Sequence, residues 1–348
     1  MATSENQKKR QVLVPGGAGY IGSHCVVELV KDGYQPIILD NGSNSSSECI
    51  KRLEQIVGCK IISYKIDCLD LERLRDVFKE QSIYAVIHCA ALKSVGESVQ
   101  KPVLYHRNNV GSLINLLTCM EEFNVKNFVF SSSATVYGIP KYLPLDEKHP
   151  CTGDAIVNPY GKSKYICEHI LRDTINAHSD WNIIILRYFN PVGAHESGLI
   201  GEDPIGKPNN LMPYLAQVAI DRLSHLNIYG TDYDTPDGTG VRDYLHVVDV
   251  ATGHTAAMKK LEENCGFKIY NLGTGRGYSV LEMIKAFEKA SGKTIRIKEC
   301  PRRSGDLATV YADPKLAMNE LGWKTERNLD QMCRDLWRWQ SNNPNGFQ

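Results

Sequence analysis

The sequence predicts an α/β protein built on a doubly wound parallel β-sheet, with a smaller mixed α/β lobe at its C-terminal end. Residues 11–190 alternate short apolar runs with amphipathic helical patterns, which is typical of a parallel sheet covered by helices on both faces. From residue 191 onward, long polar loops rich in glycine and proline appear, and such loops in a compact domain are usually functional. We therefore expect a first domain over 11–190 and a second lobe over 191–348, partly interleaved with it.

The elements of the first domain follow from apolar runs bounded by turn residues. Each predicted strand is short and rich in valine, isoleucine, leucine or phenylalanine, and each predicted helix carries apolar residues three or four positions apart. The expected strands cover 11–15, 35–40, 61–67, 85–90, 127–133 and 182–194. The expected helices cover 21–33, 71–81 and 108–124.

Composition excludes several classes of protein. The 348 residues contain 40 basic and 40 acidic side chains, and this balance argues against nucleic acid or an anionic membrane as the main partner. No apolar run approaches the roughly 18 residues of a membrane span. Residues 1–10 are not followed by the apolar h-region of a signal peptide, so we expect a disordered leader and not a secretory signal.

Eleven cysteines are scattered through the chain without any C-x-x-C pair. An unpatterned, odd-numbered set of this kind indicates reduced thiols in a cytoplasmic protein. The sequence therefore predicts no metal site, and Cys25, Cys68 and Cys89 are expected to be small buried apolar residues.

The stretch QVLVPGGAGYIGSH (11–24) leads from the first predicted strand through a glycine cluster into a helix. Gly16, Gly19 and Gly22 give the backbone close access to a pyrophosphate, which the helix N-terminus would face. Asp40 ends the second strand, where a carboxylate accepts from ribose hydroxyls and repels a 2′-phosphate, so NAD is favoured over NADP. The alternative is a glycine turn that only packs helix on strand. Pro15 lacks an N–H at this turn, so we expect NAD to bind to a loosened or less stable loop.

Tyr160 and Lys164 are four residues apart in NPYGKSKY, which places them on one face of a helix. A cation about 4 Å from a phenolate stabilises it by roughly 4 kcal/mol at an effective dielectric near 20. The pKa of Tyr160 would then fall from about 10 towards neutrality, which suits a general base. Ser133, at the end of a predicted strand, would hydrogen-bond both Tyr160 and the reacting oxygen. Ser131 and Ser132 are the competitors for this role.

Together, these motifs resemble the extended short-chain dehydrogenase/reductase superfamily. Longer runs resemble its UDP-galactose 4-epimerase family across residues 11–347: GGAGYIGSH, LKSVGESVQKP, FSSSATVYG, NPYGKSK, LRYFNPVGAH, NNLMPY, DGTGVRDYLHVVD and YNLGTGRGYSV. The resemblance implies inversion at sugar C4 through a 4-keto intermediate, with tightly bound NAD taking and returning the C4 hydride. Tyr160 would take the 4-hydroxyl proton, Ser133 would orient the 4-oxygen, and Lys164 would also hold the nicotinamide ribose.

The resemblance also implies the remaining contacts. The NAD contacts would be Gly16, Gly19, Tyr20, Ile21, Gly22, Asp40, Asn41, Asn44, Ser45, Asp67, Cys68, Cys89, Ala90, Lys93, Asn108, Tyr160, Lys164 and Tyr188. The UDP-sugar contacts would be Lys93, Ser133, Tyr160, Asn190, Asn210, Leu211, Tyr229, Arg242, Arg303, Asp306 and Val310. Arginine suits the diphosphate because its guanidinium group binds phosphate oxygens bidentately.

Departures from the family pattern bear on sugar specificity and on alternative enzyme activities. Val310 occupies the position that gates the sugar pocket, and a small residue there implies activity on UDP-N-acetylglucosamine and UDP-N-acetylgalactosamine as well. Pro15, Cys89 and Ala91 replace a threonine, a larger aromatic residue and a glycine. A nucleotide-sugar 4,6-dehydratase is the nearest rival, but Ala134-Thr135 stands where its family places an Asp-Glu pair.

Three further alternatives concern activity and assembly. A uronate decarboxylase or an alcohol dehydrogenase would share the fold, and a silent NAD-sensing regulator would commonly lack the tyrosine or the lysine. Assembly is a separate expectation. The family is typically a homodimer that forms through two helices, which here cover about 101–123 and 160–177. Leu113, Leu116 and Leu117 would serve the core or that interface equally well.

Overall fold

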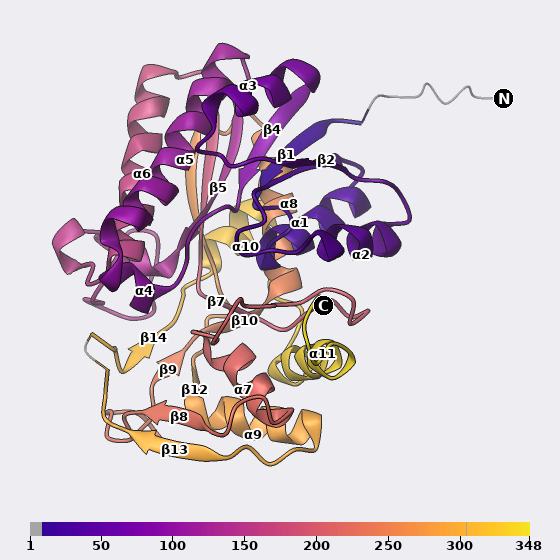
Figure 1. The fold of residues 1–348 in the computed structure, drawn as a ribbon. Helices are drawn as coiled ribbons and strands as arrows, with labels where there is room; N and C mark the ends of the chain where they lie inside the picture. Colours follow the sequence, from indigo (N-terminus) through magenta and orange to yellow (C-terminus); the bar gives the residue numbers. More distant parts are fainter. Residues whose placement is uncertain (1–8, 304) are drawn as a thin grey trace.

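The computed structural model describes residues 9–303 and 305–348, and its centre is a seven-stranded parallel sheet (Figure 1). The strand order is β11-β6-β5-β4-β1-β2-β3, and every neighbouring pair is parallel. The α/β class and the doubly wound sheet predicted from the sequence are confirmed. The strands are β1 (Gln11–Pro15), β2 (Gln35–Asp40), β3 (Ile62–Lys65), β4 (Ile83–His88), β5 (Asn127–Ser133), β6 (Asn182–Tyr188) and β11 (Phe267–Leu272).

Helices cover both faces of this sheet, because successive strand residues point to opposite sides. Val12 and Val14 of β1 belong to one apolar cluster, whereas Leu13 between them belongs to the other. The first cluster includes α1 (Tyr20–Lys31), α2 (Ser47–Val57), α8 (Val247–Leu261) and α10 (Lys315–Leu321). The second includes α3 (Leu71–Glu80), α5 (Pro102–Glu122) and α6 (Pro159–Ala177), and α4 (Val95–Gln100) lies beside them.

The strand order reverses at β1: β2 and β3 lie on one side of it in the sheet, and β4, β5, β6 and β11 lie on the other. In doubly wound sheets, ligands bind at the carboxyl ends of the strands at this switch point. The glycine-rich turn after β1 is therefore located where a cofactor is expected.

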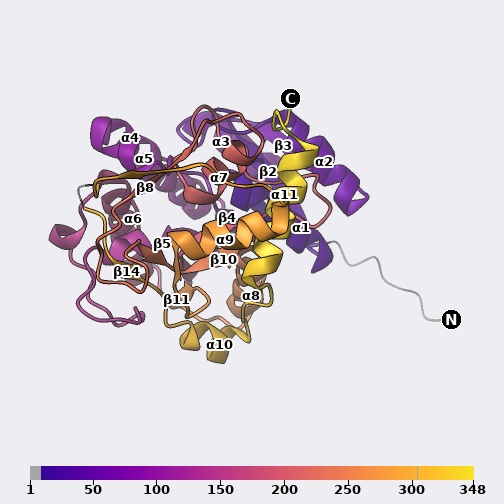
Figure 2. The same cartoon turned by 90° about the horizontal axis from the view of Figure 1, so that it is seen from below.

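The second lobe is built from short strands and three helices packed on a third apolar cluster. Figure 2 shows α7, α9 and α11 seen from below the sheet. The strands are β7 (Asn190–Val192), β8 (Leu226–Tyr229), β9 (Val241–Arg242), β10 (Tyr244–His246), β12 (Tyr278–Ser279), β13 (Ile297–Cys300) and β14 (Thr309–Val310). The helices are α7 (Leu211–Ala219), α9 (Val280–Ser291) and α11 (Leu329–Asn342).

The C-terminal half of the chain contributes to both lobes. β11, α8 and α10 all follow residue 191 in the sequence, yet they complete the first sheet and its helical cover. The interleaving therefore runs through most of the C-terminal half. The sequence did not indicate α2 or α4, and α5 begins at Pro102 rather than at residue 108. Proline is well suited to a first helical turn, which is a boundary signal that the apolar pattern alone did not supply.

Residues 1–8 of the expected leader lie outside the described residues. Within residues 9–303 and 305–348, no helix combines the length and the apolar character that a membrane-spanning segment requires.

Candidate functional site

The glycine turn between β1 and α1 depends on two close backbone approaches. Gly16 has φ +80°, a conformation that favours glycine, and its N–H donates to the Leu39 carbonyl over 2.8 Å. A β-carbon on Gly22 would lie only 2.1 Å from the Gly16 carbonyl oxygen. The turn thus forms a cradle that side chains would fill, and it opens at the N-terminus of α1. These residues fit the pyrophosphate of a dinucleotide.

Asp40 ties this turn to the loop that follows β2. Its carboxylate accepts from the Ala18 N–H (3.1 Å), the Gly42 N–H (2.9 Å) and the Ser45 hydroxyl (2.6 Å). Asn41 donates from its side chain to Asp67 over 2.9 Å. The ends of β2 and β3 are therefore joined beside the glycine turn, where the adenosine half of NAD is expected.

A pocket opens at this edge of the sheet. Eight of the residues predicted to contact NAD line it: Gly16, Asp40, Asn41, Asn44, Asp67, Cys68, Ala90 and Asn108. Six further lining residues were not predicted as contacts: Leu39, Ser43, Ile66, Ala91, Leu92 and Ser112. Most of these six are next to a predicted contact in the sequence. Their position at the ends of β2, β3 and β4 could therefore have identified them as lining residues.

Lys93 and Asn210, one from each lobe, meet at a residue that the sequence analysis missed. Glu202 is 8% exposed, and its Oε1 accepts from the Lys93 Nζ (2.5 Å) and the Asn210 side chain (3.3 Å). Tyr20, at the start of α1, donates its hydroxyl to the Gly193 carbonyl over 2.8 Å, and its neighbour Ile21 packs against the core. No motif marked Glu202, because it lies in an irregular polar loop.

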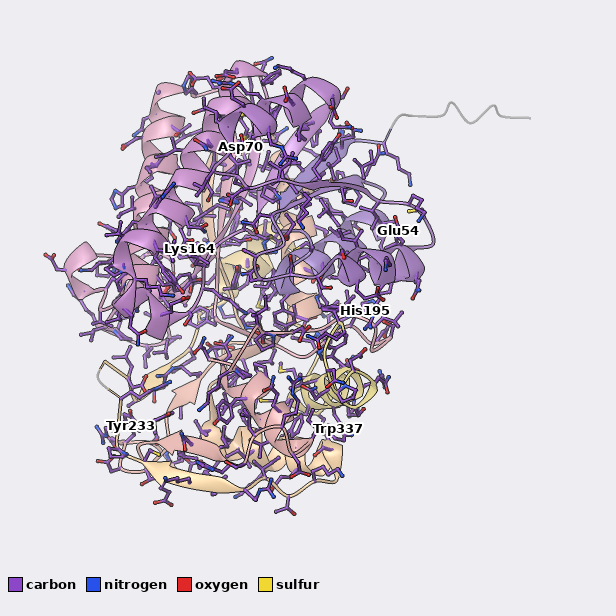
Figure 3. The ribbon with its side chains drawn as sticks, viewed as in Figure 1. Glu54, Asp70, Lys164, His195, Tyr233 and Trp337 are labelled. Carbon is purple, nitrogen blue, oxygen red and sulfur yellow. The ribbon has the colours of Figure 1, made fainter. Side chains whose placement is uncertain are left out.

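Tyr160 and Lys164 lie one turn apart in α6 and both are buried (Figure 3 labels Lys164). Lys164 donates from Nζ to the Ser131 carbonyl over 2.7 Å, and its Nζ lies 4.7 Å from the centre of the Phe130 ring. Burial raises the pKa of Tyr160 to about 12, and only the Ser133 hydroxyl opposes it. The expected lowering of this pKa is therefore not found, because burial of the phenol dominates.

The three serines at the end of β5 differ in their partners. Ser131 is hydrogen-bonded to His254 Nε2 over 2.8 Å, and Ser132 donates to Glu168 over 2.6 Å. Ser133 accepts only from the Thr135 N–H, over 3.2 Å, among the described residues. Its hydroxyl also lowers the pKa of Tyr160, which favours Ser133 over its two neighbours.

Tyr188 and Cys89 lie close to this group. Tyr188 pairs with Ser133 in the β5–β6 register, and burial raises its pKa well above the ordinary range. Cys89 contacts Ser131, with 3.4 Å between sulfur and hydroxyl oxygen. Asn108 donates to the side chain of Asn109 over 3.1 Å and lines the pocket. The predicted nicotinamide end thus adjoins the tyrosine and lysine.

Most of the predicted UDP-sugar contacts lie on the second lobe, whereas Lys93, Ser133 and Tyr160 belong to the first. Val310 of β14 pairs with Arg242 of β9, and Arg303 forms an ion pair with Asp306 over 2.7 Å. Burial raises the pKa of Tyr244 to about 12, and the charges of Arg242 and Arg303 both oppose this rise.

The other predicted contacts lie nearby in the fold. Arg303 stacks on the half-exposed ring of Tyr229, 4.8 Å from its centre. Asn190, at the start of β7, donates from its side chain to the Asp243 carbonyl over 3.2 Å. Leu211 is the first residue of α7 and follows Asn210.

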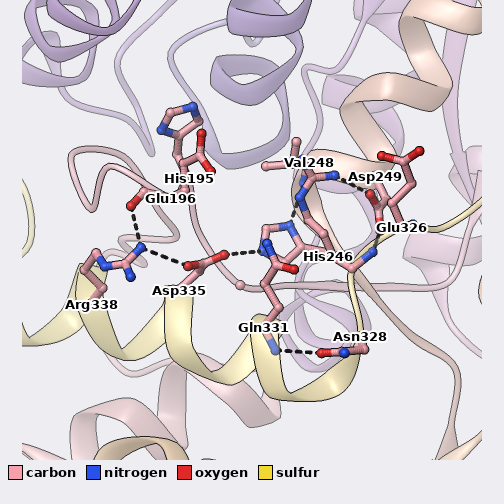
Figure 4. A network of polar contacts seen from close by, with 12 residues as sticks. His195, Glu196, His246, Val248, Asp249, Glu326, Asn328, Gln331, Asp335 and Arg338 are labelled. Atoms are coloured by element: carbon pink, nitrogen blue, oxygen red, sulfur yellow. Dashed lines mark hydrogen bonds and ion pairs between the residues drawn. The ribbon is translucent and has the colours of Figure 1, made fainter.

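A buried polar network attaches the second lobe to the first (Figure 4). His246 caps α8 by accepting from the Val248 N–H over 3.1 Å, and its Nε2 lies 3.3 Å from Asp335 of α11. Arg338 donates to Asp335 over 3.1 Å and to the Glu196 carbonyl over 2.5 Å. Because α8 packs on β5 and β6 of the first sheet, this network holds the second lobe against the first.

Comparison with known proteins gives concordant results. The family model described as GDP-mannose 4,6 dehydratase matches residues 13–336. UDP-glucose 4-epimerase of Homo sapiens is 58% identical over 343 residues, covering 97% of this chain and 98% of that protein. The Haemophilus influenzae enzyme of the same name is 57% identical over 337 residues, covering 97% of this chain and 99% of that protein.

A solved structure agrees with these relatives. UDP-glucose 4-epimerase from Bifidobacterium longum, in complex with NAD⁺ and UDP, superposes with a TM-score of 0.93 at 54% identity. The match covers 97% of this chain and 99% of that one. In the present chain, Ala134 and Thr135 begin a short 3₁₀ helix directly after Ser133 and supply no carboxylate for a dehydration.

Proposed function

Because this chain belongs to the UDP-glucose 4-epimerase family of the extended short-chain dehydrogenases/reductases, we propose that Tyr160, Lys164 and Ser133 carry out its inversion at sugar C4. The enzyme interconverts UDP-glucose and UDP-galactose and depends on NAD. The observation that carries the residue assignment is the juxtaposition of α6 and the end of β5, which places Tyr160 and Ser133 together. Bound NAD supplies reversible oxidation at C4.

The protein's own residues handle the proton and the 4-oxygen. Tyr160 exchanges a proton with the 4-oxygen, and Ser133 orients that oxygen by donating its hydroxyl hydrogen to it. With a pKa of about 12, Tyr160 is a neutral phenol at physiological pH, and positive charge is needed to favour its phenolate. Lys164 lies one turn away on the same buried side of α6 and is the protein's source of that charge.

Replacing Tyr160 tests this assignment. Tyr160→Phe removes the proton-transfer group and should lower kcat by about 10²- to 10⁴-fold. Tyr165→Phe is the matched control, because Tyr165 lies on the same helix but is partly exposed and stacks on His169. Equal activity of Tyr160→Phe and the control would overturn the assignment.

We propose that Arg242 and Arg303 hold the UDP diphosphate. The positions of Arg242 in the β9–β14 pair and of Arg303 over the Tyr229 ring, both on the second lobe, support this role. Arg303 is bound to Asp306 in the structure, so the ion pair must rearrange when Arg303 binds phosphate and Asp306 accepts from the uridine ribose. Arg303→Lys should raise KM for UDP-galactose with little change in kcat, because a lysine cannot bind phosphate bidentately. A lowered kcat at unchanged KM would contradict the proposal.

We also propose that the enzyme accepts N-acetylated sugars. Val310 is partly buried and lies opposite Arg242 in the β9–β14 pair, so a larger side chain there would occupy the space beside the diphosphate arginines. UDP-N-acetylgalactosamine should be converted by the natural enzyme and rejected by Val310→Tyr. Turnover of the plain sugars without detectable N-acetyl turnover would refute this proposal.

A homodimer through α5 and α6 is the proposed assembly. Leu113, Leu116 and Leu117 are buried in the monomer, so they serve the core. Val103 and Ile114 are exposed eleven residues apart, three turns along one face of α5, and this spacing leaves an apolar stripe. Val103→Glu combined with Ile114→Glu should convert dimer to monomer in sedimentation velocity. An unchanged sedimentation coefficient would contradict this interface.

We propose a cytoplasmic location for the enzyme. All eleven cysteines are free thiols in the structure, which suits a reducing compartment. Fractionation of the source cells with an antibody to the protein tests this, and recovery outside the cytosolic fraction would contradict it.

A further inference from the structure

Three potential metal ligands that no sequence motif connects meet behind the catalytic residues. Cys25 of α1, Cys89 after β4 and His254 of α8 place their ligand atoms within 4.8 Å of one another. Cys25 and His254 are 0% exposed, whereas Cys89 is partly exposed. No spacing in the sequence indicates this group, because its members come from three distant segments.

His254 is held in the tautomer that a metal ligand requires. Its Nδ1 lies 2.9 Å from the Val250 carbonyl oxygen, which can only accept, so Nδ1 carries the hydrogen. Its Nε2 therefore presents a lone pair towards Ser131 and the two sulfurs. Burial lowers the pKa of His254 to about 4, so the ring is neutral at physiological pH. A backbone carbonyl that orients the second nitrogen is the usual support of a metal-binding histidine.

The two thiols differ in acidity. A hydrogen bond from Cys25 lowers the pKa of Cys89, and Ser131 and the Lys164 cation add to this effect against burial. Burial raises the pKa of Cys25. Cys89 is therefore the first of the two to become a thiolate.

We propose that Cys25, Cys89 and His254 bind a thiophilic divalent cation of the zinc class, and that this binding inhibits the enzyme. Both thiols lose their protons to solvent when the cation binds, so two thiolates balance its charge, and a solvent molecule completes four-coordination. Zinc–sulfur bonds of about 2.3 Å and zinc–nitrogen bonds of about 2.0 Å require the ligand atoms to approach by roughly 1 Å.

Inhibition is expected because two of the proposed metal ligands also contact Ser131 at the end of β5. Ser131 contacts both Cys89 and His254, while its carbonyl accepts from Lys164. Metal binding withdraws both side-chain partners from Ser131 and adds a divalent cation close to Lys164. The end of β5, which also carries Ser133, would lose the contacts that fix its position.

Cobalt(II), a spectroscopic probe for zinc sites, tests binding without an activity measurement. The NAD-loaded enzyme should bind one cobalt ion per chain with a thiolate-to-cobalt charge-transfer band. Cys25→Ser should lose the band, whereas Cys333→Ser, which changes a buried cysteine in α11, should keep it. His254→Gln serves as a second variant if Cys25→Ser does not retain NAD and a cooperative melting transition. No thiolate band in the natural enzyme, or an undiminished band in a folded Cys25→Ser or His254→Gln variant, would overturn the site.

Zinc inhibition is measured separately and rests on the proposed function. Zinc should inhibit the natural enzyme at a concentration at least tenfold below that needed for Cys25→Ser, and a chelator should reverse the inhibition. Equal zinc sensitivity of the two would overturn the inhibitory role. An enzyme that binds cobalt at the thiolates yet converts no UDP-sugar would refute the proposed function and leave the metal site supported.

Discussion

Gly22→Ala is the sharpest probe of the cofactor turn. The new β-carbon would lie 2.1 Å from the Gly16 carbonyl oxygen and 2.9 Å from Gly17 Cα. Relaxed carbon–oxygen contacts begin near 3.3 Å, so the turn must open by about 1 Å. The Gly16 carbonyl accepts from the Gly19 N–H over 3.1 Å, and an opening of that size breaks this bond.

The free-energy cost of closing the turn combines the broken hydrogen bond and the overpacking. A broken backbone hydrogen bond costs about 1 kcal/mol and overpacking costs about 1–3 kcal/mol, which together give about 2–4 kcal/mol. The free loop relaxes to an open form, and NAD must close it again. The apparent affinity for NAD should therefore fall by roughly 30- to 700-fold.

Isothermal titration of NAD into cofactor-stripped protein measures this loss. Gly96→Ala is the control, because a β-carbon there meets nothing within 4 Å and Gly96 lies in α4. The control should bind NAD as the natural protein does. If Gly22→Ala bound NAD with unchanged affinity, the close approach of Gly22 to Gly16 would not be what shapes the site.

Three further changes test other parts of the structure. Pro15→Thr restores an N–H and adds a hydroxyl at the end of β1, so it should raise the melting temperature or NAD retention; no change in either would show that the position is neutral. Glu168→Gln leaves the buried Arg187 without its ion-pair partner, so it should lower the free energy of unfolding by about 3–5 kcal/mol in a denaturant titration. Glu72→Gln changes an exposed ion pair and should have little effect. Equal losses of stability in the two variants would refute the argument. Burial lowers the pKa of four histidines to about 3 or 4, below their unfolded value of 6.5, so the unfolded chain binds more protons and stability should fall as pH drops from 6.5 towards 4. A melting temperature that stays constant between pH 6.5 and 5 would contradict this. These histidines are His24, His88, His195 and His254.

Local patterns predicted the sheet and the turn because those features depend on neighbouring residues. The run QVLVP followed by glycines identifies β1 and its switch-point turn, and Tyr160 and Lys164 lie on one helix as their spacing indicates. The ends of β2 and β5 also carry Asp40 and Ser133 where the sequence places them.

Contacts between distant segments could not be predicted in this way. Glu202 bridges Lys93 and Asn210 across the two lobes, and no spacing relates these three positions. Lys164 donates to the Ser131 carbonyl at the end of β5, a contact that helical spacing does not predict. The pKa of Tyr160 depends on its burial, and helical periodicity does not reveal it.

Conversion of UDP-galactose by the purified protein without added cofactor tests the central claim most directly. An epimerase that retains its NAD should form UDP-glucose until the two sugars reach equilibrium, with no net consumption of NAD. If no UDP-glucose forms even when NAD is supplied, the chain is not a UDP-glucose 4-epimerase.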